Sequence, residues 1–236
     1  MAISANALFH FTSFQNLKKI LECKYFQAHY SKENITFRTD EITYYVPMIC
    51  FCDIPLTQIN DHIQEYDGYA IGLSKEWGIG HGLNPVFYLN QNGITVTLEN
   101  LHAGLQKHTF ASGAYEHAFA LMKPYKGRNL RNPDANIKVF YNEREWRKVP
   151  YTTQFQDKFV QQIYWGEEPA NEVKKYVEGH RFFKMEFGFS DIKYLITRSD
   201  ADKSELIDFL RSNDAVELLI TQKLKIITID EIFTVF

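Results

Sequence analysis

Three short, mostly apolar runs place the strongest constraint on what this chain can fold into. They are Leu8–Thr12, Met48–Cys52 and Tyr69–Leu73. Runs of about four to eight apolar residues between turn signals are typical of buried strands. Directly after the first run, Ser13 is a predicted helix N-cap, and apolar residues recur at helical spacing from Phe14 to about Glu22. Strands that alternate with helices in this way predict an α+β fold.

Residues 191–236 add a second alternating pattern. We predict strands at Ile192–Thr197 and Leu224–Thr228, and helices at Asp202–Leu210 and Val216–Thr221. This pattern is typical of a small α/β unit that joins an existing sheet. Because no linker rich in Pro, Gly or Ser interrupts the chain, we predict one α+β domain over residues 1–236, with a core at 1–190 and a C-terminal α/β extension at 191–236.

Five other stretches carry local signals. Residues 27–45 are polar with little periodicity, which predicts a long surface loop of the kind that forms lids. Gly78–Gly82 predicts a flexible break, Phe110–Lys123 a helix that Pro124 ends, and Ile137–Tyr141 a strand before a second strand at Glu143–Val149.

The composition excludes several classes of protein. The chain has 236 residues, of which 45% are hydrophobic and 23% charged, so it is neither disordered, collagenous nor a coiled coil. A net charge of -3 gives no general reason to bind nucleic acid. With three cysteines, no signal peptide and no long apolar run, we expect a cytoplasmic protein with reduced thiols and no membrane partner.

Aromatic residues are unusually frequent, at 15% of the chain. Tyr69 and Trp77 lie near the glycine-rich stretch, where rings could stack on a planar group such as nicotinamide. Ordinary sheet packing is the alternative explanation, and for each ring taken separately it is the favoured one. The glycine spacing matches neither a P-loop nor a dinucleotide fingerprint.

His10 and Thr12 lie two residues apart on the first predicted strand, so their side chains share one face. A histidine there could donate a hydrogen bond to a ribose hydroxyl. A histidine satisfied inside the core is the alternative.

A charged strand follows later in the chain. Glu143, Glu145 and Arg147 alternate, so they point to one face, and burying them would be costly unless they are paired. One interpretation is a carboxylate held by Arg147 and able to stabilise a positively charged intermediate. The other is a solvated edge strand.

Two further groups of side chains could carry chemistry. Lys123, Lys126, Arg128 and Arg131 are four cations around Tyr125, which indicates a loop that contacts phosphate or nucleic acid, or simply a solvated charged loop. Cys50-x-Cys52 lacks a second ligand pair, so we interpret these cysteines as structural and predict no metal site.

Several motifs in order carry a resemblance to a known family. They are Leu8–Thr12 with Leu17-x-x-Ile20-Leu21, Pro47-Met48-x-Cys50-Phe51-Cys52-Asp53-Ile54-Pro55-Leu56, Tyr69–Gly78 and Tyr141–Arg147. The chain resembles the AbiGi family of bacterial phage-resistance proteins over nearly its whole length. The resemblance implies one half of a two-gene abortive-infection module, usually described as the antitoxin.

The His10-x-Thr12 strand and the helix after it are also similar to the opening of ADP-ribosyltransferase-like proteins. This resemblance implies NAD as a substrate and a transferase-like arrangement of mixed sheets and surrounding helices. His10 would bind the ribose, Thr12 would offer a backbone amide, and Tyr69 would lie beside nicotinamide. Glu145 would be the catalytic carboxylate, assisted by Glu143 in a Glu-x-Glu pattern. The strand motif Ser-Thr-Ser of that superfamily is absent.

Two hypotheses follow. In the first, the chain transfers ADP-ribose from NAD to a nucleic-acid or protein target, which Lys126, Arg128 and Arg131 contact. It requires His10, Tyr69 and Glu145 to converge in one cleft. In the second, the chain is an antitoxin that neutralises a partner toxin by contact alone.

Overall fold

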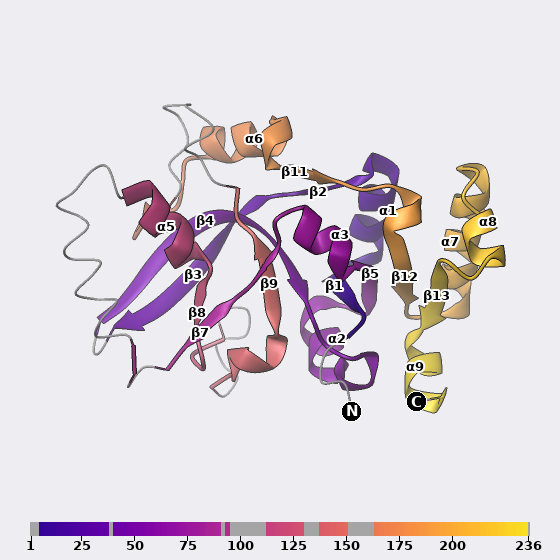
Figure 1. Cartoon of the computed structure of the whole chain (residues 1–236), viewed down its shortest axis with the longest axis horizontal. Helices are drawn as coiled ribbons and strands as arrows, with labels where there is room; N and C mark the ends of the chain where they lie inside the picture. The colour runs from indigo at the N-terminus through magenta and orange to yellow at the C-terminus, as the bar shows by residue number, and fades with distance from the viewer. Residues whose placement is uncertain are drawn as a thin grey trace. The chain divides into compact units, whose positions relative to one another are not determined.

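The computed structural model describes residues 5–37, 40–90, 93–94, 112–129, 137–150 and 163–235 (Figure 1). They form two compact units, between which the chain passes more than once. Unit 1 holds the residues up to Phe26, Phe51–Gly82 and the residues from Glu186 onward. Unit 2 holds Gln27–Cys50 and Leu83–Met185. The sequence predicted one domain over residues 1–236, and this stays a prediction.

A mixed sheet forms the centre of unit 1. Its strands, in spatial order, are β13 (Lys225–Thr228), β12 (Ile192–Thr197), β5 (Tyr69–Ser74) and β1 (Ala7–Thr12). β1 and β12 run antiparallel to β5, whereas β13 runs parallel to β12. Gly72 lets β5 approach its neighbour, because a Cβ atom there would lie 2.7 Å from Cε1 of Phe9.

Serine residues begin three of the helices of unit 1. The helices are α1 (Phe14–Cys23), α2 (Asn60–Tyr66), α3 (Lys75–Gly80), α7 (Asp200–Ser212), α8 (Glu217–Ile220) and α9 (Ile229–Val235), with short 3₁₀ turns η1 (Leu56–Gln58) and η5 (Phe189–Asp191). Ser13, Ser74 and Ser199 each accept a backbone N–H of the first turn that follows them. These caps satisfy N–H groups that a helix start leaves without a partner, so they fix where α1, α3 and α7 begin.

A long antiparallel hairpin organises unit 2. β3 (His29–Phe37) pairs with β4 (Asp40–Cys52) from His29 opposite Met48 to Phe37 opposite Asp40. β10 (Tyr164–Trp165) also pairs with β4, and β9 (Glu145–Lys148) and β6 (Asn84–Pro85) follow β4 in the sheet. The last two residues of β4 belong to unit 1, where Cys52 pairs with Phe9.

The remaining elements of unit 2 are short. β7 (Phe87–Leu89) and β8 (Met122–Pro124) form a parallel pair. The helices are α5 (Ser112–Ala120) and α6 (Asn171–Gly179), with 3₁₀ turns η2 (Phe140–Glu143) and η4 (Arg181–Phe183). β2 (Tyr25–Gln27) and β11 (Lys184–Glu186) pair with each other and contain residues at which the chain passes between the units.

The mixed α+β class is confirmed. The apolar runs at Leu8–Thr12 and Tyr69–Leu73 are strands β1 and β5, and the predicted strand Ile192–Thr197 is β12. The specifically transferase-like arrangement stays a prediction. In the part of the chain that the structure describes, no helix is long and apolar enough to cross a membrane.

The prediction of a surface loop at residues 27–45 was wrong, because this stretch contains the last residue of β2, the whole of β3 and the first part of β4. Ile35, Tyr44, Val46 and Met48 are all buried in the core of unit 2. Tyr44, Val46 and Met48 alternate with other residues, which is the period of a strand with one buried face. Polar residues make up most of positions 29–43, before this alternating stretch, and they concealed the strand.

Three smaller predictions were also wrong. Gly78 and Gly80 lie in helix α3, whose start Ser74 caps, rather than in a flexible break. The helix predicted to reach Lys123 ends at Ala120, because residues 122–124 pair with β7 as β8. The strand predicted at Ile137–Tyr141 is a single bridge at Lys138 followed by η2.

Candidate functional site

The most unusual feature of unit 2 is a buried network of charged side chains around Glu145 on β9. One carboxylate oxygen, Oε1, accepts from Nε of Arg147 at 2.7 Å, and the other, Oε2, accepts from Nζ of Lys123 at 2.8 Å. Lys123 also donates to Oε2 of Glu143 at 2.6 Å. The sequence predicted that Glu143, Glu145 and Arg147 share one face of a strand. Glu145 and Arg147 lie two apart on β9 and are both buried, as predicted, whereas Glu143 precedes the strand as the last residue of η2. The alternative of a solvated edge strand was wrong.

Arg147 is the centre of the network and is 0% exposed. Its Nη1 donates to the backbone oxygen of Ala120 at 3.0 Å, and its Nη2 donates to Oε1 of Glu33 at 2.9 Å. A third cation, Lys138, lies 2.7 Å from Oε1 of Glu143. We call these six residues the charge network: Glu33, Lys123, Lys138, Glu143, Glu145 and Arg147. Among the described residues, three carboxylates of the network face three cations, and such pairing is what burial of charged groups requires.

The pKa values of the network follow from this balance. Burial alone would raise the pKa of Glu145, but the positive charges of Arg147 and Lys123 outweigh it and hold that pKa well below its ordinary value. The pKa of Glu143 is lowered against the same effect of burial, chiefly by Lys123. Burial would lower the pKa of Lys123, yet the surrounding carboxylates, Glu145 first, raise it. Glu143, Glu145 and Lys123 therefore stay charged near neutral pH.

The two cysteines of β4 have structural surroundings. Cys52 is buried in the core of unit 1, and Cys50 packs against the core of unit 2. Burial is the main reason that the pKa of the Cys50 thiol is raised, so it is a poor nucleophile at neutral pH. Within the described ranges, no group of three His, Cys, Asp or Glu residues is placed to hold a metal ion.

The basic loop divides into a buried and an exposed part. Lys123 is buried in the charge network, so its assignment to a phosphate-contacting loop was wrong. Lys126 and Arg128 are exposed. Arg131 lies outside the described residues. A role for these residues in binding a macromolecule stays a prediction.

In unit 1, His10 lies within a cluster of aromatic side chains. The centre of its ring is 5.2 Å from that of Phe26 and 5.5 Å from that of Phe51. Trp77 contacts the same two rings at 6.1 and 5.9 Å, and its own ring lies 4.5 Å from that of His81. The indole N–H of Trp77 is buried and bonds to none of the described residues. His10 thus shares an aromatic environment with Trp77.

The other two predicted cofactor residues also lie in unit 1. The hydroxyl of Tyr69 donates to Oδ2 of Asp202 at 3.1 Å, and its ring packs 5.0 Å from the ring of Phe14. Thr12 is the last residue of β1, directly opposite Tyr69 on β5. Unit 1 therefore holds His10, Thr12, Tyr69 and Trp77, whereas unit 2 holds Glu143 and Glu145. Their convergence in one cleft stays a prediction.

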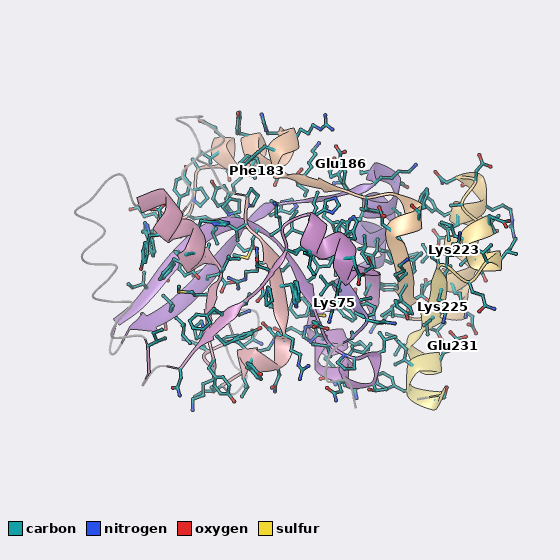
Figure 2. All side chains as sticks on the ribbon, viewed as in Figure 1. Lys75, Phe183, Glu186, Lys223, Lys225 and Glu231 are labelled. Carbon is teal, nitrogen blue, oxygen red and sulfur yellow. The ribbon has the colours of Figure 1, made fainter. Side chains whose placement is uncertain are left out.

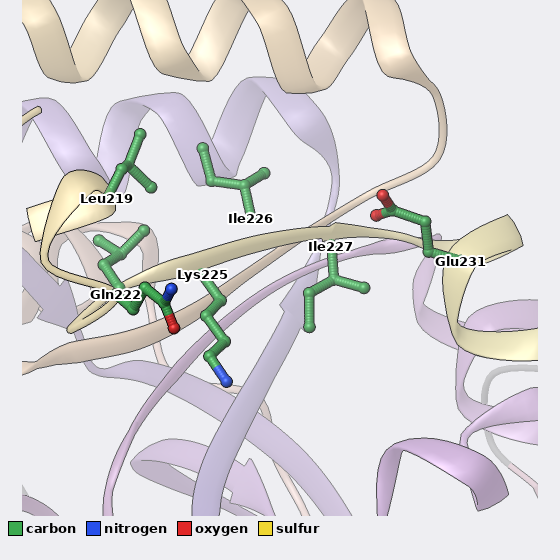
Figure 3. A pocket seen from close by; sticks show the side chains of 7 residues that line it. Leu219, Gln222, Lys225, Ile226, Ile227 and Glu231 are labelled. Atoms are coloured by element: carbon green, nitrogen blue, oxygen red, sulfur yellow. The ribbon is translucent and has the colours of Figure 1, made fainter. Parts of the chain in front are cut away.

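Unit 1 also has an open groove of about 440 Å³ along β13, the outermost strand of its sheet (Figure 3). Both ends of this strand edge are already bonded. Leu224 donates its N–H to the backbone oxygen of Leu218 at 3.0 Å, and Thr228 donates its N–H to Oε2 of Glu231 at 2.8 Å. The backbone N–H and C=O groups of residues two apart along a strand point to the same edge. Between Leu224 and Thr228, Ile226 is therefore the residue of β13 that offers its N–H and C=O to the outer edge. The edge is therefore protected against pairing with another strand.

Sequence reasoning missed Glu33 and Lys138 as members of the charge network. Glu33 lies on β3, 114 positions before the arginine it contacts. An alternating pattern around Tyr44 and Val46 could have indicated the strand β4, but it does not show that the hairpin contacts β9.

Fold and site together define a mixed α+β protein whose most distinctive interior feature is an ion-pair network. A family model described as "Putative abortive phage resistance protein AbiGi, antitoxin" matches residues 18–198. The chain belongs to this AbiGi family. It is similar to a protein of Lactococcus lactis subsp. cremoris named "Abortive phage resistance protein AbiGi", with 28% identity over 212 residues, covering 77% of this chain and 81% of that protein. No solved structure matches the chain.

Proposed function

We propose that this protein is an antitoxin that neutralises a partner toxin by direct contact, without catalysis. The observation that carries the proposal is the match of residues 18–198 to a family described as an antitoxin in abortive phage resistance. The partner in this proposal is the protein encoded by the other gene of a two-gene module.

The state of Glu145 supports binding over catalysis. A carboxylate that stabilises a developing positive charge needs an oxygen directed at the reacting atom. Both oxygens of Glu145 are already bonded to Arg147 and Lys123, and the side chain is buried. Glu143 is held in the same way by Lys123 and Lys138. Both carboxylates are suited to fixing the structure of unit 2.

NAD-dependent ADP-ribosyl transfer is the competing proposal. The buried N–H of Trp77, which bonds to none of the described residues, favours a polar ligand near the aromatic cluster of His10. Against it, the rings of His10 and Tyr69 already pack on protein rings, and the Tyr69 hydroxyl is bonded to Asp202. The residues that would bind nicotinamide and ribose are thus engaged within the protein.

Co-expression with the partner toxin tests the two proposals. His10→Phe keeps a ring between Phe26 and Phe51 and removes the imidazole, so contact-based protection of growth should survive it. Purified protein should also transfer no label from labelled NAD to cell extract.

Two outcomes would favour the enzyme instead. One is loss of protection by a His10→Phe variant that melts at the wild-type temperature. The other is label transfer by the wild type that His10→Phe abolishes. Tyr25→Phe, another ring substitution in unit 1, is the matched control.

A further inference from the structure

We propose that the toxin binds, through an acidic patch with apolar neighbours, to one exposed surface of unit 2. This surface is formed by Tyr125, Lys126, Arg128, Ile137 and Tyr141, and we call it the 125–141 surface. The proposal rests on the proposed antitoxin function and adds where on the chain the contact is made and with what chemistry.

Three large apolar side chains of this surface are exposed to solvent. Ile137 is 70% exposed, Tyr141 50% and Tyr125 42%. The ring centres of Tyr125 and Tyr141 lie 5.7 Å apart, and the angle between the ring planes is 31°. The backbone N–H of Tyr141 donates to the backbone oxygen of Tyr125 at 3.2 Å. Grouped exposed apolar side chains are typical of surfaces that bind a partner. Tyrosine and arginine are also enriched among the residues that contribute most to protein interfaces.

Two cations stand beside these apolar groups. Lys126 and Arg128 are exposed, and no carboxylate of the described residues lies within ion-pair distance of either. Gly127, between them, pairs with Lys138 in an antiparallel bridge. This register places Arg128 opposite Ile137, so the positive charge and the most exposed apolar side chain are neighbours. A carboxylate flanked by apolar groups complements this arrangement.

The surface has a rigid support. Gly127 and Lys138 exchange two backbone hydrogen bonds of 3.0 and 2.9 Å. Beneath them, Lys138 contacts Glu143 of the charge network, and Nζ of Lys123 lies 4.8 Å from the centre of the Phe140 ring. The network thus ties together the two chain segments that present the surface. A preorganised surface loses less conformational entropy on binding than a loose one.

The chemistry favours a protein over a nucleic acid. Ile137, the most exposed apolar side chain of the surface, suits contact with protein side chains and offers a base nothing to stack on, which leaves stacking to the rings of Tyr125 and Tyr141. The whole chain carries a net charge of -3, so it has no general attraction for a nucleic acid of many phosphates. Two cations can also neutralise only a few phosphates, and nucleic-acid affinity depends on the number neutralised.

The test compares two charge-reversal variants of the full chain by calorimetric titration with the purified partner toxin. The surface variant is Lys126→Glu with Arg128→Glu. The matched control is Lys223→Glu with Lys225→Glu in unit 1, two exposed lysines with the same spacing (Figure 2). We expect the surface variant to bind the toxin at least about tenfold more weakly, and the control to bind as the wild type does.

Tyr141→Ala gives a second, uncharged variant, with the same loss expected. Thermal melting of each variant at the wild-type temperature establishes that the fold is intact.

The outcomes separate the two proposals. If the wild type does not bind the toxin, both are overturned. If the wild type binds and the surface variants bind equally well, the 125–141 surface is overturned while the antitoxin function stands. A single-stranded RNA oligonucleotide serves as a further probe. If the wild type binds it and loses that binding with Lys126→Glu and Arg128→Glu, without effect on toxin binding, the surface recognises nucleic acid and the inference is wrong.

Discussion

Replacing Glu145 by Gln should destabilise unit 2 strongly while changing its shape little. The substitution keeps the side-chain volume but removes the charge that accepts from Arg147 at 2.7 Å and from Lys123 at 2.8 Å. Removing one partner of a buried ion pair costs about 3–5 kcal/mol. Because Lys123 keeps Glu143 and Arg147 keeps Glu33, we expect a cost near 3 kcal/mol, the lower end of that range.

Urea denaturation measures this cost. With an m value near 3 kcal/mol/M, a cost of about 3 kcal/mol should lower the urea midpoint by about 1 M. That cost is a large share of the roughly 5–15 kcal/mol that stabilises a typical protein. Glu167→Gln is the matched control, because Glu167 is exposed and the same change there should shift stability by under about 0.5 kcal/mol. A loss of less than about 1 kcal/mol for Glu145→Gln would refute the view that this network holds unit 2 together.

Three further predictions concern pH, packing and thiols. Folding lowers the pKa values of Glu143 and Glu145, so their contribution to stability is present above a pH of about 4.3 and is lost as the pH falls through the folded-state values. The unfolding midpoint, measured over a series of acid pH values, should therefore fall, and Glu145→Gln should make this dependence on pH weaker. Gly72→Ala should cost about 1–3 kcal/mol by denaturation, because the new Cβ would lie 2.7 Å from the Phe9 ring; an unchanged midpoint would contradict the close approach of the strands. A thiol reagent should modify Cys23 in the native protein and reach Cys50 and Cys52 only after denaturation, whereas fast modification of all three would contradict the burial of β4.

Local patterns predicted the elements that depend on local chemistry. Ser13 caps α1 because its hydroxyl accepts a nearby N–H, and this pattern is visible in the sequence. The apolar run at Tyr69–Leu73 is a strand because nearly every side chain in it can be buried. The shared face of Glu145 and Arg147 follows from the period of a strand alone.

Long-range partners could not be predicted in this way. The pairing of Arg147 with Glu33 depends on the hairpin of β3 and β4, which the polar composition of residues 27–45 concealed. Lys123 looked like part of a basic loop, because the sequence shows three more cations after it and does not show the carboxylates that surround it in space. Charge pairing is decided by tertiary contacts, so neither partner reveals it alone.

The stoichiometry of toxin neutralisation tests the central claim most directly. Purified chain is titrated into a fixed amount of active partner toxin, with and without added NAD. An antitoxin that acts by contact should abolish toxin activity at about one chain per toxin-binding site. If binding is tight, toxin activity should fall linearly with added chain until that ratio is reached. Added NAD should not change the result. Complete neutralisation by a small fraction of that amount, dependent on NAD, would contradict the account and establish a catalytic protein.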